Sequence, residues 1–250
     1  MIERAAGHPM ERRSTRRQNG RRVGMIVPSV NAVVEPDFAW ISPEGITFHT
    51  TRIPLFATTP EGLREMNRSV EAAAGLLAHL SPDLIVFACT SGSFVDGEEG
   101  LQRQIDLIGQ IGKCPVVATS RAIIQSCREL GIDRIDVATP YLDSVNEFER
   151  TFFEGHGLEV TSLVGLGLSG PAIREVPPDD IVALARRANT SEGQGMFLSC
   201  TDLRALEVVD RLEAEFGKPV LTSNQVTMWA ILKALGDPVQ YPGFGRILAQ

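Results

Sequence analysis

The chain contains two copies of one pattern, and this internal repeat limits the possible folds more than any other feature. Residues 22–28 are matched by residues 134–140, which lie 112 positions later, and Cys89-Thr90 is matched by Cys200-Thr201, 111 positions later. A third anchor, a Gly-Lys run leading to Pro-Val, recurs with the offset reduced to 104 at the prolines. Three anchors in the same order at nearly constant spacing predict two similar halves.

Within each half, short apolar runs alternate with stretches of helical periodicity. The run at residues 84–88 is continuous and apolar, as expected for a parallel strand that is covered on both faces. Strands that alternate with helices are typical of βαβ units and a parallel sheet. The sequence therefore predicts an α/β fold.

The expected elements follow this alternation through the chain. We expect the first half to comprise residues 22–118 and 223–250, and the second half to comprise residues 119–222. Strands are expected at residues 22–28, 46–53, 83–88, 114–118, 134–139, 158–164, 196–200 and 219–222. Helices are expected at residues 33–40, 59–79, 97–111, 119–130, 143–154, 179–187, 203–216 and 225–235, with a Gly/Pro loop at 165–178.

Each half presents a cysteine where its third strand ends. Ligands of open parallel sheets bind beyond the carboxyl ends of the strands, which is where Cys89 and Cys200 are expected. A single cysteine is more often a small buried apolar residue. A helix N-terminus beside the strand end lowers a thiol pKa, and the repeat places a second thiol opposite the first. We therefore expect a catalytic pair, whereas Cys114 and Cys127 are expected to serve packing.

Polar residues follow the same strand ends and are the candidate substrate ligands. Ser and Thr hydroxyls and Asn amides at such positions form turns or cap helices, and they also donate hydrogen bonds to a carboxylate. Both uses are compatible. Asn224 is expected to be the N-cap of the last helix instead. The candidate substrate-binding residues are Ser29, Asn31, Thr90, Ser91, Tyr141 and Thr201.

Charge and cysteine content exclude several classes of protein. Residues 1–22 hold seven Arg against Glu3 and Glu11, so this segment carries +5 and the remainder −12 of the net −7. We expect residues 1–21 to be a disordered basic tail, and the acidic body argues against a nucleic-acid partner. No apolar run reaches the ~18 residues of a membrane helix. Four scattered cysteines and no signal peptide predict a reducing, cytoplasmic location.

No motif predicts a metal or an organic cofactor. Residues 165–170 match GxGxxG, but Pro171, Pro177 and Pro178 prevent the immediate helix that a dinucleotide site needs. The four histidines are far apart and lack metal-ligand spacing. The predicted partner is a small molecule.

Taken together, these motifs resemble the aspartate/glutamate racemase superfamily over residues 22 to about 236. Within it, the chain is similar to the branch of maleate cis–trans isomerases, arylmalonate decarboxylases and ectoine-utilisation proteins, and it resembles the last of these most. The motifs that carry the resemblance are Pro28-Ser29-Val30-Asn31 with Glu35, Ala88-Cys89-Thr90-Ser91, Ala138-Thr139-Pro140-Tyr141, Ser199-Cys200-Thr201-Asp202-Leu203-Arg204 and the run from Lys218 to Gln225.

The resemblance implies two pseudo-symmetric flavodoxin-like halves, each a short parallel sheet flanked by helices, with the active site between them in a homodimer or higher oligomer. It implies cofactor-independent chemistry on a small carboxylate, with Cys89 as nucleophile or base and Cys200 as acid. Asn31, Tyr141 and the groups at Thr90, Ser91 and Thr201 would hold the carboxylates.

The chain differs from the family's motifs at two places, and both differences bear on the expected substrate. Arylmalonate decarboxylases lack the first cysteine, so Cys89 argues against that activity. Maleate isomerases carry an Asp-Asn pair where this chain has Ser169-Gly170, which favours the ectoine-utilisation relatives.

The leading hypothesis is an isomerase of a dicarboxylate such as maleate. Three alternatives stay open: a racemase or decarboxylase of the same superfamily, a carboxylate-binding protein that lost turnover, and a redox switch through a Cys89–Cys200 disulfide. The last requires Cα atoms within ~7 Å.

Overall fold

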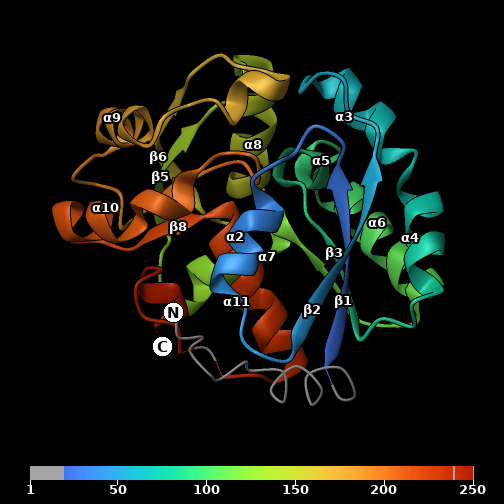
Figure 1. Ribbon diagram of the computed structural model, residues 1–250. Helices are drawn as coiled ribbons and strands as arrows, with labels where there is room; N and C mark the ends of the chain where they lie inside the picture. Colours follow the sequence, from blue (N-terminus) through green and yellow to red (C-terminus); the bar gives the residue numbers. More distant parts are fainter. Residues whose placement is uncertain (1–19, 239, 250) are drawn as a thin grey trace, which may run out of the picture.

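The structure, a computed structural model, describes residues 20–238 and 240–249 and contains two four-stranded parallel sheets (Figure 1). The first sheet has the order β2-β1-β3-β4, with β1 (Arg21–Pro28), β2 (Ile46–Ile53), β3 (Leu84–Phe87) and β4 (Val116–Ala118). The second has the order β6-β5-β7-β8, with β5 (Arg134–Thr139), β6 (Glu159–Gly165), β7 (Gly195–Leu198) and β8 (Val220–Thr222). The predicted α/β fold of two pseudo-symmetric halves is confirmed.

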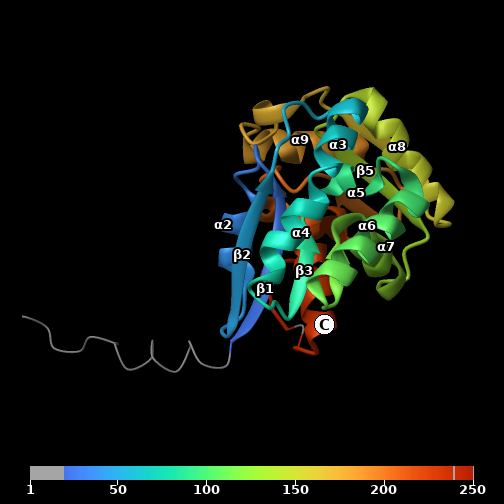
Figure 2. The same ribbon diagram turned by 90° about the vertical axis from the view of Figure 1, so that its right-hand side faces the viewer.

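Helices flank both sheets. Up to residue 130 they are α2 (Val34–Ile41), α3 (Pro60–Asn67), α4 (Val70–Ala78), α5 (Thr90–Phe94), α6 (Gly97–Gly112) and α7 (Thr119–Glu129). Beyond it they are α8 (Asp143–Gly155), α9 (Pro178–Ala188), α10 (Val209–Phe216) and α11 (Ser223–Leu235), with short 3-10 helices η1 (Gly170–Ile173), η2 (Ala205–Val208) and η3 (Arg246–Leu248). Figure 2 shows α4 and α6 covering one face of the first sheet.

The two strands that lead to the cysteines, β3 and β7, are fully buried. Every residue of β3 and of β7 is buried, because helices cover both faces of a parallel sheet. β1 pairs with β3 and β5 pairs with β7 at corresponding positions, so that Val23 faces Leu84 and Ile135 faces Gly195. One continuous hydrophobic core runs through both halves. The carboxyl ends of β3 and β7 therefore meet inside the molecule.

The helix predicted over residues 59–79 is two helices. Thr59 caps α3 as expected, accepting a hydrogen bond from the Gly62 N–H, and Pro60 occupies its first position. The chain then turns at Arg68 and Ser69 before α4 begins. The break has a packing reason, since α3 contacts α5 whereas α4 lies against β1 and β2.

Smaller differences from the expected elements have local causes. Pro36 lies within α2 without breaking it, because a proline in the first turn interrupts no helical hydrogen bond. The predicted helix at 203–216 begins as η2 before α10, and the 165–178 loop contains η1. The N-cap prediction for Asn224 is wrong: Thr222 caps α11 in a capping box with Gln225.

The helices α7 and α11 pack against each other at the junction of the halves. The Thr227 hydroxyl on α11 lies 3.1 Å from the Thr119 hydroxyl on α7. α11 also contacts α2, β3, β4 and β8, so elements of both halves surround it. The boundaries at residues 118 and 222 stay a prediction. Residues 1–19 of the predicted tail lie outside the described residues, and Arg21 already belongs to β1.

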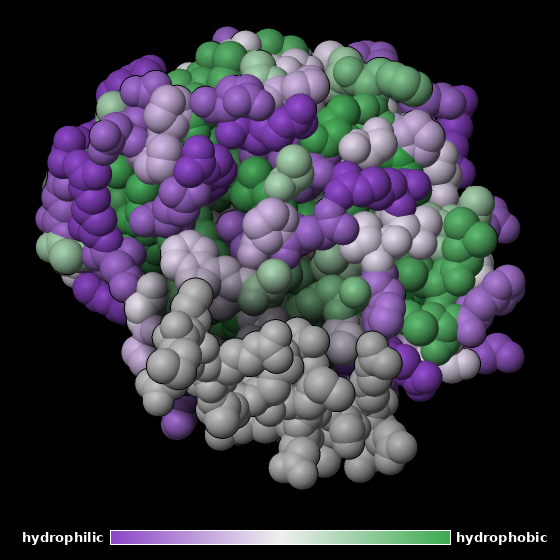
Figure 3. Space-filling view, viewed as in Figure 1, coloured by the Kyte–Doolittle hydropathy of each residue, from purple (hydrophilic) through white to green (hydrophobic). Residues whose placement is uncertain are grey.

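In the described part of the chain, no helix has both the length and the apolar character that a bilayer crossing requires. The face in Figure 3 mixes hydrophilic residues with smaller hydrophobic patches. Among residues 20–238 and 240–249, the exposed large hydrophobic side chains are Trp40 on α2, Phe56 in the loop after β2 and Leu76 on α4. The homodimer and the cytoplasmic location stay predictions.

Candidate active site

Cys89 joins β3 to α5 and is the N-cap of that short helix. Its Sγ accepts a hydrogen bond from the Gly92 N–H at 3.3 Å, and the side chain is 4% exposed. A Cβ on residue 92 would lie 3.0 Å from this sulfur and 2.6 Å from Met66 Cε, so a larger residue there would crowd the thiol. The sequence thus fixes the thiol against the first turn of α5.

Cys200 follows β7 in a strained backbone conformation. Its φ of 98° lies in a region that residues other than glycine rarely adopt. Two contacts hold it there: the Cys200 N–H donates to Ser223 Oγ at 3.0 Å, and the Asp202 N–H donates to Cys200 Sγ at 3.4 Å. Strain of this kind persists only where surrounding contacts impose it, as at functional sites.

The two thiols line one small internal cavity between the halves. Its volume is about 20 Å³, which accommodates roughly one water molecule. The structure therefore describes a closed site. Five of the six predicted substrate-binding residues also line it, namely Asn31, Thr90, Ser91, Tyr141 and Thr201.

Two loops, one from each half, close the cavity. The Thr58 N–H donates to Ser169 Oγ at 2.8 Å, and the Gly170 N–H donates to Thr58 Oγ1 at 3.3 Å. Arg174, just after η1, donates to the Val30 carbonyl at 2.6 Å. A ligand larger than water can enter only when these contacts across the halves open.

Hydrogen bonds connect the predicted ligands to one another and to Ser223. Asn31 Oδ1 accepts from the N–H groups at the start of α2, while its Nδ2 donates to Thr201 Oγ1 at 3.0 Å. Thr90 Oγ1 donates to Ser223 Oγ at 2.8 Å. These residues therefore assemble the site as well as lining it.

Ser29 does not line the cavity, in contrast to its prediction as a substrate ligand. Its side chain is exposed and holds the loop after β2 instead: Ser29 Oγ accepts from the Leu55 N–H at 3.0 Å. The physical reason is that the turn after β1 directs Asn31 inward and leaves Ser29 on the outer side.

Burial raises the pKa of both site thiols. For Cys89 it raises the pKa to about 11, although the Gly92 N–H and the Ser91 hydroxyl act in the opposite direction. Burial and the Asp202 carboxyl raise the pKa of Cys200 well above its usual range. The expectation of thiol pKa values lowered by a helix N-terminus is wrong for this closed structure, because desolvation is the larger effect.

The sequence interpretation missed Asp202, which also lines the cavity. Burial raises its pKa to about 6, while the Ala32 N–H, which donates to Oδ1 at 2.7 Å, acts in the opposite direction. Its neighbours Arg174 and Arg52 lower the pKa as well. The sequence signal that could have identified Asp202 is its position two residues after Cys200.

Ser223 and Asn224 were missed as residues that join the halves. Ser223 accepts from both Thr90 and the Cys200 backbone. Asn224 Nδ2 donates to Asp37 Oδ2 at 2.7 Å and to the Thr201 carbonyl at 3.1 Å. The third repeat anchor of the sequence ends at Thr222-Ser223, and this position could have indicated that Ser223 lies near the site.

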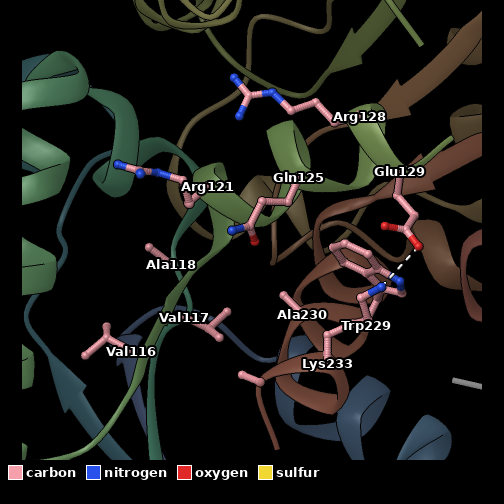
Figure 4. Close-up of a pocket in the computed structure, with 11 residues that line it drawn as sticks. Val116, Val117, Ala118, Arg121, Gln125, Arg128, Glu129, Trp229, Ala230 and Lys233 are labelled. Atoms are coloured by element: carbon pink, nitrogen blue, oxygen red, sulfur yellow. Dashed lines mark hydrogen bonds and ion pairs between the residues drawn. The ribbon is translucent and has the colours of Figure 1, made fainter. Parts of the chain in front are cut away.

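A larger groove of about 580 Å³ lies away from the cysteines, between β4, α7 and α11 (Figure 4). Three of its four charged side chains have partners: Lys233 pairs with Glu129 at 3.1 Å and lies over the Trp229 ring, and Arg121 binds Glu98. No thiol lines it. We therefore place the chemistry in the smaller, closed cavity.

All four cysteines are free thiols, so the Cys89–Cys200 disulfide is not formed in this structure. Among residues 20–238 and 240–249, no three His, Cys, Asp or Glu side chains are grouped as potential metal ligands.

Known proteins resemble this chain over almost its whole length. It is 30% identical to the maleate isomerase of Nocardia farcinica over 243 residues, covering 92% of this chain and 96% of that protein. It is also 30% identical to the arylmalonate decarboxylase of Bordetella bronchiseptica over 229 residues, covering 90% and 95%.

Solved structures show the same similarity. A variant of the Nocardia farcinica maleate cis–trans isomerase with a covalently bound succinylcysteine intermediate matches with a TM-score of 0.89 and 27% identity, covering 92% of this chain and 98% of that one. A Pseudomonas putida S16 maleate isomerase variant with maleate matches with a TM-score of 0.87 and 26% identity, covering 92% and 97%.

The family model described as arylmalonate decarboxylase matches residues 23–248, which include both strand-end cysteines and every element around the cavity. The chain therefore belongs to the arylmalonate decarboxylase family.

Proposed function

We propose that this protein is a two-cysteine isomerase that converts a small cis-unsaturated dicarboxylate such as maleate into its trans isomer. The observation that carries the proposal is the presence of two buried thiols in one cavity, one from each half. Relatives named maleate isomerase, one of them solved with a succinylcysteine intermediate, support the same chemistry.

The reaction begins with addition to the double bond. The Cys89 thiolate donates an electron pair to one alkene carbon, forming an S–C bond, and the π electrons move toward the neighbouring carbon and its carboxylate. The Cys200 thiol gives its proton to that carbon and keeps the S–H electron pair as a thiolate. Rotation about the new single bond follows. Cys200 then takes a proton back, the S–C bond breaks and the trans alkene forms.

We expect Cys89 to lose its proton while the site is open to water. Burial is the main cause of its raised pKa, and opening the contacts of Thr58 with Ser169 and Gly170 would admit water. Hydration removes the desolvation penalty of the thiolate. Closure around the substrate would then exclude water from the covalent intermediate.

The polar lining suits carboxylates that gain charge during the reaction. Asn31, Thr90, Ser91 and Thr201 carry amide or hydroxyl groups, are buried and line the cavity. Fixed donors of this kind stabilise an enolate-like intermediate, since they need no reorganisation as charge develops. The route uses only protein groups and substrate, so it needs no cofactor.

A second candidate within the family is decarboxylation or racemisation of a related carboxylate. The arylmalonate decarboxylase relative and the apolar side of the cavity at Val30, Leu55 and Ile173 favour it. The presence of Cys89 in addition to Cys200 favours isomerisation. A link to ectoine utilisation, and a binding protein without turnover, stay predictions.

Intact-protein mass spectrometry after incubation with maleate tests the proposal. We expect a succinyl adduct on the wild type that is absent in Cys89→Ser. The adduct should accumulate in Cys200→Ala, because water can supply the proton for addition whereas no Cys200 thiolate is present to remove a proton for elimination. The half-buried Cys114 supplies a matched control, and Cys114→Ser should leave the adduct unchanged.

An adduct that persists in Cys89→Ser would contradict the assigned nucleophile. Solvent deuterium appearing at the α-carbon of an amino or hydroxy acid, with no adduct, would favour proton-transfer chemistry instead. Tight maleate binding that Cys89→Ser leaves unaltered, without turnover, would identify a binding protein.

A further inference from the structure

Asp202 is the one carboxyl group among the described residues that line the cavity, and the reaction above gives it no role. It follows Cys200 by two residues and is 5% exposed. Its Oδ1 accepts from the Ala32 N–H at 2.7 Å, whereas its Oδ2 is buried without a hydrogen-bond partner in the described part of the chain. A buried carboxylate oxygen without a donor is costly, so a ligand that brings a donor to Oδ2 would bind more tightly.

The cavity lining contains no cation to balance this carboxyl group. Among the described residues that line it, none is Lys, Arg or His. Arg174 and Arg52 act on Asp202 from outside the lining, and their guanidinium groups donate to the carbonyls of Val30 and Asn31. A second anion placed beside Asp202 would therefore meet a like charge with no cation between them.

Asp202 is ionised at and above neutral pH. Burial raises its pKa to about 6, and the N–H groups of Ala32 and Val33 act in the opposite direction, as do the two arginines. The titratable side chains that interact with it inside the site are the thiols of Cys89 and Cys200. Burial raises the pKa of both thiols, so in the closed structure Asp202 is the only charged group of the described lining.

The two halves thus offer unlike polar groups to a substrate. The first half supplies amide and hydroxyl groups, at Asn31, Thr90 and Ser91, that can bind a carboxylate. The second half adds Asp202, which only accepts hydrogen bonds while it is ionised. A substrate with two carboxylates matches the first set of groups but not Asp202. A substrate with one carboxylate and one hydrogen-bond donor matches both.

We propose that Asp202 selects a cis-unsaturated monoamide, with one carboxylate and one amide group, over the corresponding dicarboxylate. This inference rests on the proposed function and names its substrate class. The amide N–H donates to Asp202 Oδ2. The amide carbonyl also stays conjugated with the double bond and activates it for addition, which an ammonium or hydroxyl donor does not do. Maleate is then the poorer substrate and binds when it shares a proton with Asp202.

Calorimetric binding at pH 7.5 tests this selectivity without turnover. The probes are succinate and its monoamide succinamate, which lack the double bond and cannot add Cys89. We expect wild type to bind succinamate more tightly than succinate by roughly tenfold or more, as for a hydrogen bond to a charged group. Asp202→Asn should reverse this preference, because its amide can still accept from the Ala32 N–H and can donate to a carboxylate.

A surface carboxylate supplies the matched control for the loss of charge. Glu175 pairs with Arg174 at 3.4 Å and its side chain is 75% exposed. Glu175→Gln removes one negative charge beside the same arginine, yet it should keep the wild-type preference for succinamate. The wild-type comparison decides even if Asp202→Asn fails to fold. Wild type that binds succinate as tightly as succinamate, or binds neither, would overturn the proposal.

Kinetics with the unsaturated pair separate this inference from the proposed function. At pH 7.5 we expect a higher kcat/KM for maleamate, the cis monoamide, than for maleate in wild type, and the reverse order in Asp202→Asn. If succinamate is preferred in binding but neither alkene is isomerised, the proposed function fails and the selectivity of Asp202 stands. If wild type and Asp202→Asn isomerise maleate equally well and wild type shows no preference in binding, the inference fails and the proposed function stands.

Discussion

At the residue scale, the two halves hold their cysteines in different ways. Cys89 has an extended backbone with φ of −145° at a helix N-cap, whereas Cys200 has φ of 98°. The sequence repeat predicts two equivalent thiols, yet the backbone makes only one of them strained. The difference matches the unequal roles proposed for nucleophile and acid.

This asymmetry predicts opposite responses to glycine. Cys200→Gly should be more stable than Cys200→Ala by about 1 kcal/mol, because glycine adopts positive φ without strain. Cys89→Gly should be less stable than Cys89→Ala by about 0.5–1 kcal/mol, since glycine there only loses more conformational entropy. Urea unfolding of the four variants measures both differences. Equal stabilities of the Cys200 pair would show that the backbone is not strained.

At the element scale, a buried ion pair joins the strands of the second half. Lys218, two residues before β8, lies 2.6 Å from the fully buried Asp136 on β5, and its Nζ also donates to the Thr190 and Gly193 carbonyls. Burial raises the pKa of Asp136, but hydrogen bonds from Lys218, Thr161 and Thr190 outweigh it and lower the pKa overall. The Gly-Lys repeat anchor thus has a structural role.

Lys218→Met should destabilise the protein by about 3 kcal/mol at pH 7, because it leaves Asp136 buried without its cation. A lowered folded-state pKa means that the contribution is present above the unfolded value of 3.8 and is lost as the pH falls through the folded value. The difference between wild type and variant should therefore shrink in acid, as measured by urea unfolding at several pH values.

The exposed pair of Arg186 with Glu215 provides the control for this ion pair. Arg186→Met should cost less than about 1 kcal/mol, since exposed pairs contribute little. If Lys218→Met cost no more than this control, the ion pair would not be a structural link.

At the scale of the whole molecule, the halves share one core and one site. Hydrogen bonds from Asn31 to Thr201 at 3.0 Å and from the Cys200 N–H to Ser223 Oγ at 3.0 Å join the halves. The buried helix α11 contacts elements of both sheets. Neither half completes the cavity lining alone, so catalysis requires both in their closed arrangement.

We expect the two halves to unfold together. Because the core is continuous, loss of one half exposes apolar surface of the other. Fluorescence of Trp229 on α11 and of Trp40 on α2 should give the same urea midpoint as far-ultraviolet circular dichroism of the whole chain. Two separated transitions would show that the halves are independent domains.

The sequence by itself determined the α/β alternation, the two halves and the pairing of Cys89 with Cys200, because periodicity and internal repeats are local or linear properties of the chain. Only the tertiary structure decided which polar groups reach the cavity. It turned Ser29 away from the cavity and brought Asp202 into its lining, since these depend on side-chain direction and on contacts between distant segments. The raised thiol pKa of Cys89 likewise follows from burial, which no local motif encodes.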